Sequence, residues 1–351
     1  MKKQGKIRAV GIRVNAIYTY ATADLNKGGE YYPYQYLPWR HPALEWAEVF
    51  KADTLGMGFK VNGLDWNKYE LAIVFSHSDS MGSAALIRKL NPKIKIMMIP
   101  EPPPEYLLHR IPFQWLPRLV DDFQAANIVG LAHEAYLDDF KARFHTKNIH
   151  FTGVPINIED MQIRMDLSKR KNIVASTTHC NYGEPSRRSW EIIQRAMYSP
   201  DMKGYITRCF YAYTLDYLHK LNLMFDEAYN FIWDYAQHIP RMNECKIFVD
   251  DNICAASGHM SLEMACLDIP SVGCNDFITH LYPEISYPSV AIHPSPERRK
   301  SEVDILAGFV RKLATDESFY KSMVDKGRQQ LWDIYSYKAC KKRAEALLGI
   351  V

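Results

Sequence analysis

The sequence of 351 residues lacks the patterns that would place it in a membrane. No apolar run approaches the roughly 18 residues that a membrane-spanning helix needs. The start, residues 1–6, is basic but leads directly into a strand-like run, without the apolar segment and cleavage site of a signal peptide. We therefore expect a cytoplasmic protein with no membrane span.

Cysteine is scarce and unevenly placed, which argues against a disulfide or zinc framework. The seven cysteines all lie in the second half of the chain, in an odd number and without a CxxC pair. Most of them sit in apolar runs, where a free thiol packs as a small hydrophobic side chain. The twelve histidines form no HExxH motif, so the sequence predicts no metal site.

Two common nucleotide-binding fingerprints and a strong net charge are also missing. No GxGxxG motif follows the first strand pattern, which argues against a dinucleotide-dependent oxidoreductase. No Walker-type phosphate loop is present, which argues against an ATPase of that class. The net charge of +3 neither indicates nor excludes a polyanionic partner.

What the sequence does have is a regular alternation of short strand patterns and helix patterns. In the first half, strand patterns occupy residues 7–14, 71–75, 95–99, 126–131 and 150–152, with helix patterns at 41–52 and 84–90. The second half shows strand patterns at 172–176, 204–211, 246–250, 271–273 and 289–292, with helix patterns at 187–197, 215–225 and 261–267. Short apolar strands separated by helices predict parallel sheets. We expect an α/β protein of two tandem Rossmann-like, doubly wound domains that face a cleft.

The boundaries of these domains are predicted from the change in composition between the halves. The first domain covers residues 1–157 and ends at the Gly153 to Asn157 exit segment, and a charged linker covers 158–171. The second domain covers residues 172–330. Three amphipathic helix patterns, at 303–315, 319–335 and 338–348, complete the chain.

The most informative segment covers residues 257–272 and predicts a loop, a short helix, a turn and a buried strand. Gly258 allows the backbone to approach a ligand closely. The amides around Ser257, His259, Met260 and Ser261 would form a helix N-terminus, which favours a diphosphate. Glu263 follows in the first helical turns, where a carboxylate can accept hydrogen bonds from ribose hydroxyls.

This segment resembles the nucleotide-binding signature of the GT-B glycosyltransferases. Ser261, Glu263, Ala265 and Pro270 match the order and spacing of that signature, although Ala255 stands where many retaining members carry a second Glu. The resemblance implies that a nucleotide-sugar donor, most simply a UDP-sugar, binds the second domain. It implies that Glu263 holds the ribose and that residues 238–241 form a loop, with Ile239 and Arg241, around the nucleobase. It also implies that the last helix, within residues 331–351, packs toward the first domain.

A closer resemblance is to the phage-type DNA glucosyltransferases, whose late Glu lies in a context like that of residues 262–265. These enzymes carry two arginines in the loop after the first strand of the second domain. Here Arg187 and Arg188 end the loop 176–188, and Thr177 of this loop is also expected to contact the donor. An arginine suits a diphosphate because its planar fork can donate to two oxygens. The resemblance implies transfer of glucose to a hydroxymethylated pyrimidine in double-stranded DNA, in a host cytoplasm if the protein is viral.

The same resemblance implies a catalytic carboxylate after a strand of the first domain. Glu101, in the proline-rich segment that follows the strand pattern at 95–99, occupies the equivalent place. A carboxylate held there could remove the proton of the acceptor hydroxyl as the new bond forms. Asp79 and His77, in the loop after the preceding strand pattern, are the alternatives for this base.

Several alternatives remain open from the sequence. A glycan, a lipid or a small molecule could supply the acceptor hydroxyl, and a nucleotide-sugar epimerase or a non-catalytic binding module could share the donor site. The consecutive Asp250 and Asp251 resemble the paired aspartates that hold a divalent metal in other sugar transferases. We favour a structural role for them at the end of a buried strand.

Overall fold

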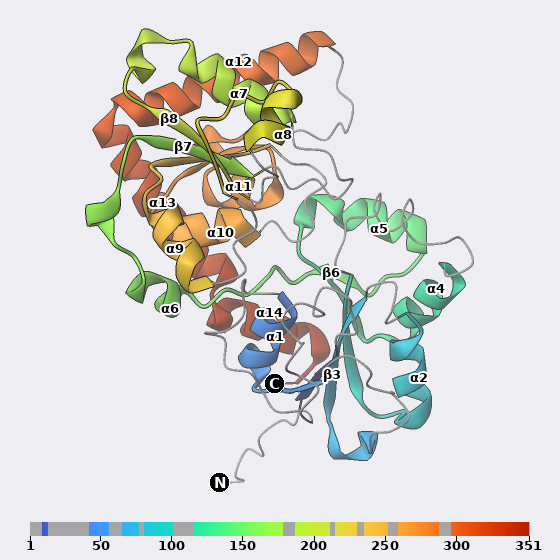
Figure 1. Cartoon of the computed structure of the whole chain (residues 1–351). Helices are drawn as coiled ribbons and strands as arrows, with labels where there is room; N and C mark the ends of the chain where they lie inside the picture. Colours follow the sequence, from blue (N-terminus) through green and yellow to red (C-terminus); the bar gives the residue numbers. More distant parts are fainter. Residues whose placement is uncertain are drawn as a thin grey trace. The chain divides into compact units, whose positions relative to one another are not determined.

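The computed structural model describes most of the chain, and these residues form two compact units. The described ranges are 9–12, 42–55, 65–76, 81–100, 116–177, 187–210, 215–229, 235–251, 259–287 and 296–350. Unit 1 comprises residues 1–156 and 334–351, and unit 2 comprises residues 157–333. Figure 1 shows that each unit is built from strands covered by helices. Residues 158–171, the expected linker, therefore belong to unit 2.

Unit 1 contains a six-stranded parallel sheet in the order β2-β1-β3-β4-β5-β6. Its strands are β1 (Ala9–Ile12), β2 (Asp53–Leu55), β3 (Leu71–Ser76), β4 (Lys95–Pro100), β5 (Ile128–Leu131) and β6 (Ile149–Phe151). Its helices are α1 (Pro42–Phe50), α2 (Ser83–Leu90), α4 (Leu116–Ala125), α5 (Leu137–Phe144) and α14 (Tyr337–Leu348). The expected strand and helix patterns of the first half are thus present. The structure adds helices α4 and α5 and the strand β2, which is too short for its periodicity to be read.

Two apolar layers cover the two faces of this sheet, and β3 shows how the sequence divides between them. Ala72 and Val74 pack with α2 and α4 on one face, whereas Leu71, Ile73 and Phe75 pack with α1 and α14 on the other. Successive side chains of a strand point to opposite faces, so a continuous apolar run is needed to cover both.

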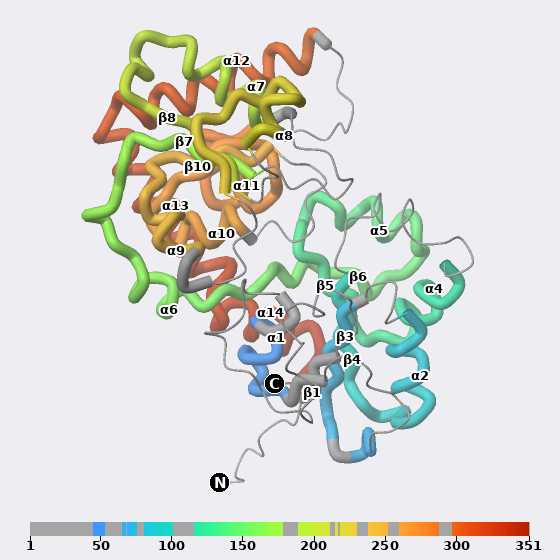
Figure 2. The backbone as a smooth tube through the Cα atoms, in the orientation of Figure 1, coloured from blue at the N-terminus to red at the C-terminus, as the bar shows by residue number. Residues whose placement is uncertain are grey.

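The last helix of the chain, α14, is part of the core of unit 1. Figure 2 shows it beside α1, and Cys340, Ala344 and Leu348 are buried in the same apolar layer as Trp46. The hydroxyl of Tyr337 lies 2.7 Å from Glu48 Oε2. Helix α14 therefore closes a face of the sheet that begins more than two hundred residues earlier.

Helix α2 has no capping side chain of its own, because its N-cap residue is Gly82. Asp122, which lies on α4, supplies the missing acceptor: its carboxylate accepts from the amides of Gly82 at 2.6 Å and Ala85 at 2.9 Å. Burial raises the pKa of Asp122 to about 6. This contact fixes the two helices that cover one face of the sheet against each other.

Unit 2 contains a five-stranded parallel sheet in the order β11-β10-β7-β8-β9. Its strands are β7 (Ile173–Thr177), β8 (Ile206–Phe210), β9 (Glu227–Tyr229), β10 (Ile247–Asp250) and β11 (Ser271–Gly273). Its helices are α6 (Ile158–Ile163), α7 (Arg187–Met197), α8 (Leu215–Lys220), α9 (Tyr235–Asn243), α10 (His259–Cys266), α11 (Asp276–Leu281), α12 (Pro296–Thr315) and α13 (Glu317–Tyr335). Helices α7 and α12 lie over one face and α9 and α10 over the other (Figure 1). The prediction of two doubly wound α/β units is confirmed.

Two local predictions in the second half are wrong. Residues 238–241, expected to be a loop, lie inside α9, which accommodates Pro240 in its second turn. The helix expected over 215–225 ends at Lys220, and the edge strand β9 follows. A three-residue strand and a proline-containing helix give weak periodic signals, so tertiary packing decides both. The strand expected at 289–292 lies outside the described residues.

The cysteines behave as the sequence predicts. Those within the described residues are buried free thiols: Cys209, Cys245, Cys266, Cys274 and Cys340. Burial raises the pKa of Cys245 and of Cys340 to about 12, so neither is a thiolate near neutral pH. Within the described part of the chain, no helix is long and apolar enough to cross a membrane.

Gly273 is required by the close pairing of β11 with β10. A Cβ atom there would lie 2.0 Å from the carbonyl oxygen of Asp250. We expect Gly273→Ala to lower the free energy of unfolding by about 2–3 kcal/mol, because the strands must separate to admit the methyl group. Gly308→Ala is the control: Gly308 lies within α12 and its added Cβ would meet only Arg311 at 3.8 Å. The free energy of unfolding of that variant, measured by urea denaturation, should rise by about 0.5–1 kcal/mol. Equal effects of the two substitutions would contradict the prediction.

His238 is buried in α9 against the ring of Phe210. Burial lowers the pKa of His238 from 6.5 to about 4, since the charged form loses its hydration. The unfolded chain therefore binds a proton at a higher pH than the folded chain, and stability falls as the pH drops from 6.5 to 4. The shift corresponds to about 3 kcal/mol. Between pH 6.5 and pH 4, the free energy of unfolding of His238→Gln should therefore fall by about 3 kcal/mol less than that of the wild type. Parallel curves for the variant and the wild type would rule out this role for His238.

Candidate functional site

The strand order of unit 2 identifies one edge of its sheet as the ligand-binding edge. The chain leaves β7 toward β8 and β9 on one side and returns to β10 and β11 on the other. In open parallel sheets, ligands bind outside the carboxyl ends of the strands, where the strand order reverses. In unit 2 this reversal, called the switch point below, lies between β7 and β10. The last residues of these two strands, Thr177 and Asp250, border it.

Two helices begin at this switch point, one on each face of the sheet. Helix α7 follows β7 and begins at Arg187, and helix α10 follows β10 and begins at His259. The amino end of a helix carries unpaired amides and a partial positive charge, so it attracts anions. Unit 2 thus directs two helix amino ends toward one point.

Glu263 lies in the middle of α10, which is buried along the whole of residues 260–267. Its side chain is only 2% exposed. A glutamate on a solvated helix face would be largely exposed, so Glu263 does not lie on such a face. The carboxylate is enclosed within unit 2, on the helix that follows β10 at the ligand-binding edge of the sheet.

The amino end of α10 is held by a buried polar cluster formed by Asp250, Ser261 and Asn275. Ser261 Oγ donates to Asp250 Oδ2 at 3.0 Å, and Asn275 Nδ2 donates to the same oxygen at 2.8 Å. Asn275 Oδ1 also accepts from the amide of Ile278 at 2.9 Å and so caps α11. The three side chains are 2%, 0% and 5% exposed, respectively. The Ser261 hydroxyl, expected among the donor-binding groups, is thus directed at Asp250.

Asp251 makes the corresponding contacts on the other face of the sheet. Its amide donates to Ser189 Oγ of α7 at 3.0 Å, and its Oδ2 pairs with Arg299 Nη1 of α12 at 2.7 Å. Arg299 also pairs with Glu191 at 2.9 Å. The two aspartates therefore serve opposite faces, in agreement with the structural role favoured for them. No group of three metal-ligating side chains occurs within the described ranges.

The remaining predicted donor residues lie in different environments. Thr177 and Met260 are buried beside the switch point, at the end of β7 and in the first turn of α10. Ile239 is buried in α9, whereas the half-exposed Arg241 stacks on Tyr229 at 4.8 Å and faces Glu244 at 3.9 Å. Ser257 and Gly258 lie outside the described residues, and the side chains of His259, Arg187 and Arg188 are likewise not described.

In unit 1 the strand order reverses between β1 and β3. The predicted bases follow two strands of this sheet in the sequence, His77 and Asp79 after β3 and Glu101 after β4, and all three lie outside the described residues. A further titratable group at this edge was not predicted: His133, which is 8% exposed, follows β5 and packs edge-on against Tyr136. Its position two residues beyond a strand pattern was the signal that could have identified it.

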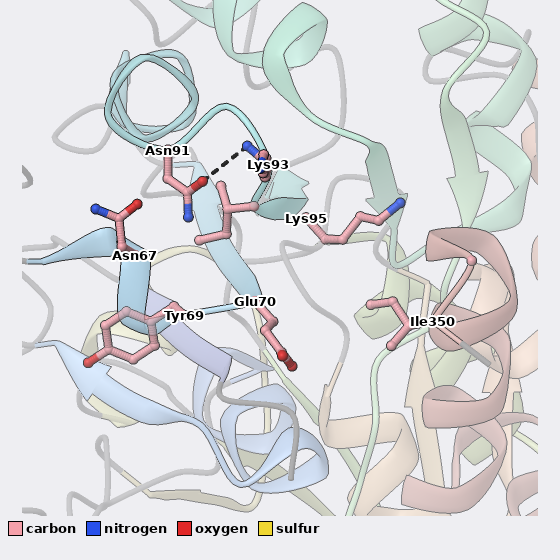
Figure 3. Close-up of a pocket in the computed structure, with 9 residues that line it drawn as sticks. Asn67, Tyr69, Glu70, Asn91, Lys93, Lys95 and Ile350 are labelled. Atoms are coloured by element: carbon pink, nitrogen blue, oxygen red, sulfur yellow. Dashed lines mark hydrogen bonds between the residues drawn. The ribbon is translucent and has the colours of Figure 1, made fainter. Parts of the chain in front are cut away.

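A cavity of about 430 Å³ also occurs in unit 1, but at the opposite edge of the sheet. Its lining comes from the residues that precede β3 and β4 and from the end of the chain, and Figure 3 shows Asn67, Asn91 and Lys95 among its side chains. Ligands of parallel sheets bind at the carboxyl ends of strands, and this cavity lies at the amino ends. The topology therefore favours the switch points as functional sites.

Comparison with solved structures shows which fold this is. An α-glucosyltransferase in complex with UDP and a 13-mer DNA containing a HMU base matches with a TM-score of 0.65 and 10% identity, over 98% of this chain and 100% of that chain. The Anabaena protein HepE in complex with UDP and glucose matches with a TM-score of 0.64 and 10% identity, over 98% of this chain and 100% of that chain. An α-glucosyltransferase in complex with UDP matches with a TM-score of 0.59 and 9% identity, over 90% and 97%.

Sequence comparisons add nothing to this result. No protein-family model matches the chain, and no curated protein sequence matches it. Because the sequence identities to these solved structures are near 10%, the likeness shows the fold alone. The chain has the GT-B fold, with two Rossmann-like domains, as the motif around Glu263 implied.

Proposed function

We propose that this protein is a glycosyltransferase that moves a sugar from a UDP-sugar donor to an acceptor hydroxyl. The observation that carries the proposal is the buried Glu263, held in α10, the helix that follows β10. This is the position at which a Rossmann-like domain binds a nucleotide. Solved proteins with this fold contain UDP, which supports the choice of donor nucleotide.

In this proposal unit 2 binds the donor. The carboxylate of Glu263 accepts hydrogen bonds from the ribose hydroxyls, and the diphosphate lies between the amino ends of α7 and α10. Two helix dipoles and one arginine, Arg187 or Arg188, then offset the negative charge that develops on the leaving diphosphate. Unit 1 supplies the acceptor side, with Glu101, Asp79 or His77 as the base.

The proposal is tested by thermal unfolding with UDP-glucose, UDP and other nucleotide sugars. A donor at 100 times its dissociation constant should add about 2.7 kcal/mol of stability. Release of UDP on addition of an acceptor distinguishes a transferase from a binding module, and conversion of the UDP-sugar without acceptor would indicate an epimerase. Failure of every nucleotide sugar to raise the melting temperature would refute the donor site.

For the acceptor, we propose a hydroxymethylated pyrimidine in double-stranded DNA. The support is the likeness to the glucosyltransferase solved with UDP and a DNA that contains a HMU base. That match covers 98% of this chain and 100% of the glucosyltransferase. HepE, solved with UDP and glucose, has a nearly equal TM-score, so a glycan or a small molecule is the competing acceptor.

DNA binding provides a direct test of this acceptor. Electrostatic binding to phosphates should weaken steeply with salt, by about 10³-fold or more between 50 and 200 mM if six or more contacts form. Transfer of radiolabelled glucose to HMU-containing DNA, but not to the same duplex with thymine, should follow. Absence of DNA binding at low salt would remove DNA as the acceptor and leave the donor proposal standing.

A further inference from the structure

The end of β10 carries two adjacent buried carboxylates that contact opposite faces of the sheet. Asp250 receives hydrogen bonds from Ser261 of α10 and from Asn275, the cap of α11. Asp251 is bound to Ser189 of α7 and Arg299 of α12. Asp250 and Asp251 are 2% and 0% exposed, respectively. One strand end is therefore joined to both helices that begin at the switch point.

We propose that Asp250, with Ser261 and Asn275, is a positioning device for the donor site: it sets the first turn of α10, and hence Glu263, relative to β10. The inference rests on the proposed function of α10 in donor binding. None of the three side chains needs to touch the donor. Ser261 lies two residues before Glu263, so a change in the contact of Ser261 with Asp250 alters the orientation of the turn that precedes the carboxylate.

The backbone around this contact is closely packed. The carbonyl oxygen of Asp250 approaches Gly273 so closely that a Cβ added there would lie only 2.0 Å from it, which fixes the spacing of β10 and β11 at this point. Asn275 lies two residues after that glycine. Its side-chain Nδ2 donates to Asp250, and its Oδ1 accepts from the backbone amide of Ile278. The carboxylate is thus bound by donors from two directions in a buried setting, where such hydrogen bonds are strongest.

Reversal of the donor and acceptor in the Asp250–Asn275 contact tests the proposal. Asn275→Asp places two buried carboxylates against each other, and Asp250→Asn places two amide groups together. Each single variant should raise the dissociation constant of UDP-glucose about tenfold or more. The double variant, Asp250→Asn with Asn275→Asp, restores a donor facing an acceptor. Residue 275 still caps α11, and the dissociation constant should return to within about threefold of the wild-type value.

Asn243→Asp is the matched control. Asn243 is 3% exposed and, like Asn275, uses both ends of its amide, accepting from the amide of Asp166 at 3.1 Å and donating to the carbonyl of Arg164 at 2.8 Å. It lies before β10, at the opposite end of that strand. The control should lower the melting temperature while the dissociation constant of UDP-glucose stays unchanged.

The outcomes separate the inference from the function on which it rests. If the wild type binds UDP-glucose and Asn275→Asp behaves like Asn243→Asp, the cluster is structural only and the inference is overturned. Failure of the double variant to recover binding overturns it as well. If the wild type itself binds no UDP-sugar, the proposed function fails, and the positioning role fails with it.

Discussion

Replacement of Glu263 by Gln should lower kcat/KM for a UDP-sugar by about 100-fold or more, chiefly through a higher KM. A carboxylate that accepts two ribose hydrogen bonds contributes roughly 1.5–3 kcal/mol for each bond, and an amide keeps only one good acceptor. Binding of UDP measured by calorimetry should weaken in parallel, because the interaction is made in the ground state as well as the transition state.

Glu302→Gln is the control for this experiment. Glu302 is 1% exposed, lies in the same unit on α12 and pairs with Arg298 at 3.0 Å. Both substitutions remove a buried negative charge, so both are expected to change the melting temperature. Only Glu263→Gln should change donor affinity. An unaltered KM in Glu263→Gln, with the protein folded, would remove Glu263 from the donor site.

The second large effect is expected at Glu101, the proposed base of the acceptor side. Glu101→Gln should reduce kcat by about 100-fold or more, because general base catalysis contributes about 10²–10⁴ to the rate. The thermal stabilisation by UDP-glucose should remain, since the donor is assigned to the other unit. Initial rates and thermal unfolding on the same protein samples measure the two quantities.

Asp79→Asn and His77→Gln form the comparison set for the base. If Glu101 is the base, these two variants should retain turnover within about tenfold of the wild type, because neither removes the proton acceptor. A large loss of kcat in Asp79→Asn or His77→Gln, with near-normal turnover in Glu101→Gln, would transfer the role to the segment that follows β3. This segment is a plausible place for the base because it follows β3, which borders the switch point of unit 1.

The donor side illustrates how far a motif can be interpreted without a structure. The order of a small-residue loop, a helix start, Glu263 and a proline before a strand predicted the helix and the strand, which the structure contains as α10 and β11. The motif could not show that Ser261 is directed at Asp250, because that contact joins residues from two elements whose distance depends on the sheet. The role of a hydroxyl in a motif depends on its neighbours in space.

The segment at 238–241 illustrates the converse. The GT-B resemblance implied a loop there, and Pro240 agreed with it, since proline within a helical pattern usually ends or bends a helix. In α9, which continues through Pro240, His238, Ile239 and Met242 are buried, and His238 packs against Phe210 of β8. Burial of these side chains offsets the hydrogen bond lost at Pro240, and this balance depends on what the helix packs against.

The sequence by itself determined the fold class, the order of most strands and helices, and the helix and strand of the segment at 257–272. These follow from local periodicity and from residues that are close together in the chain. Tertiary structure decided what depends on residues far apart: Asp122 capping α2, and Asp250 and Asp251 joining the two helices at the switch point. The physical reason is that a hydrogen bond or an apolar contact requires proximity in space, which sheet topology creates and local sequence does not encode.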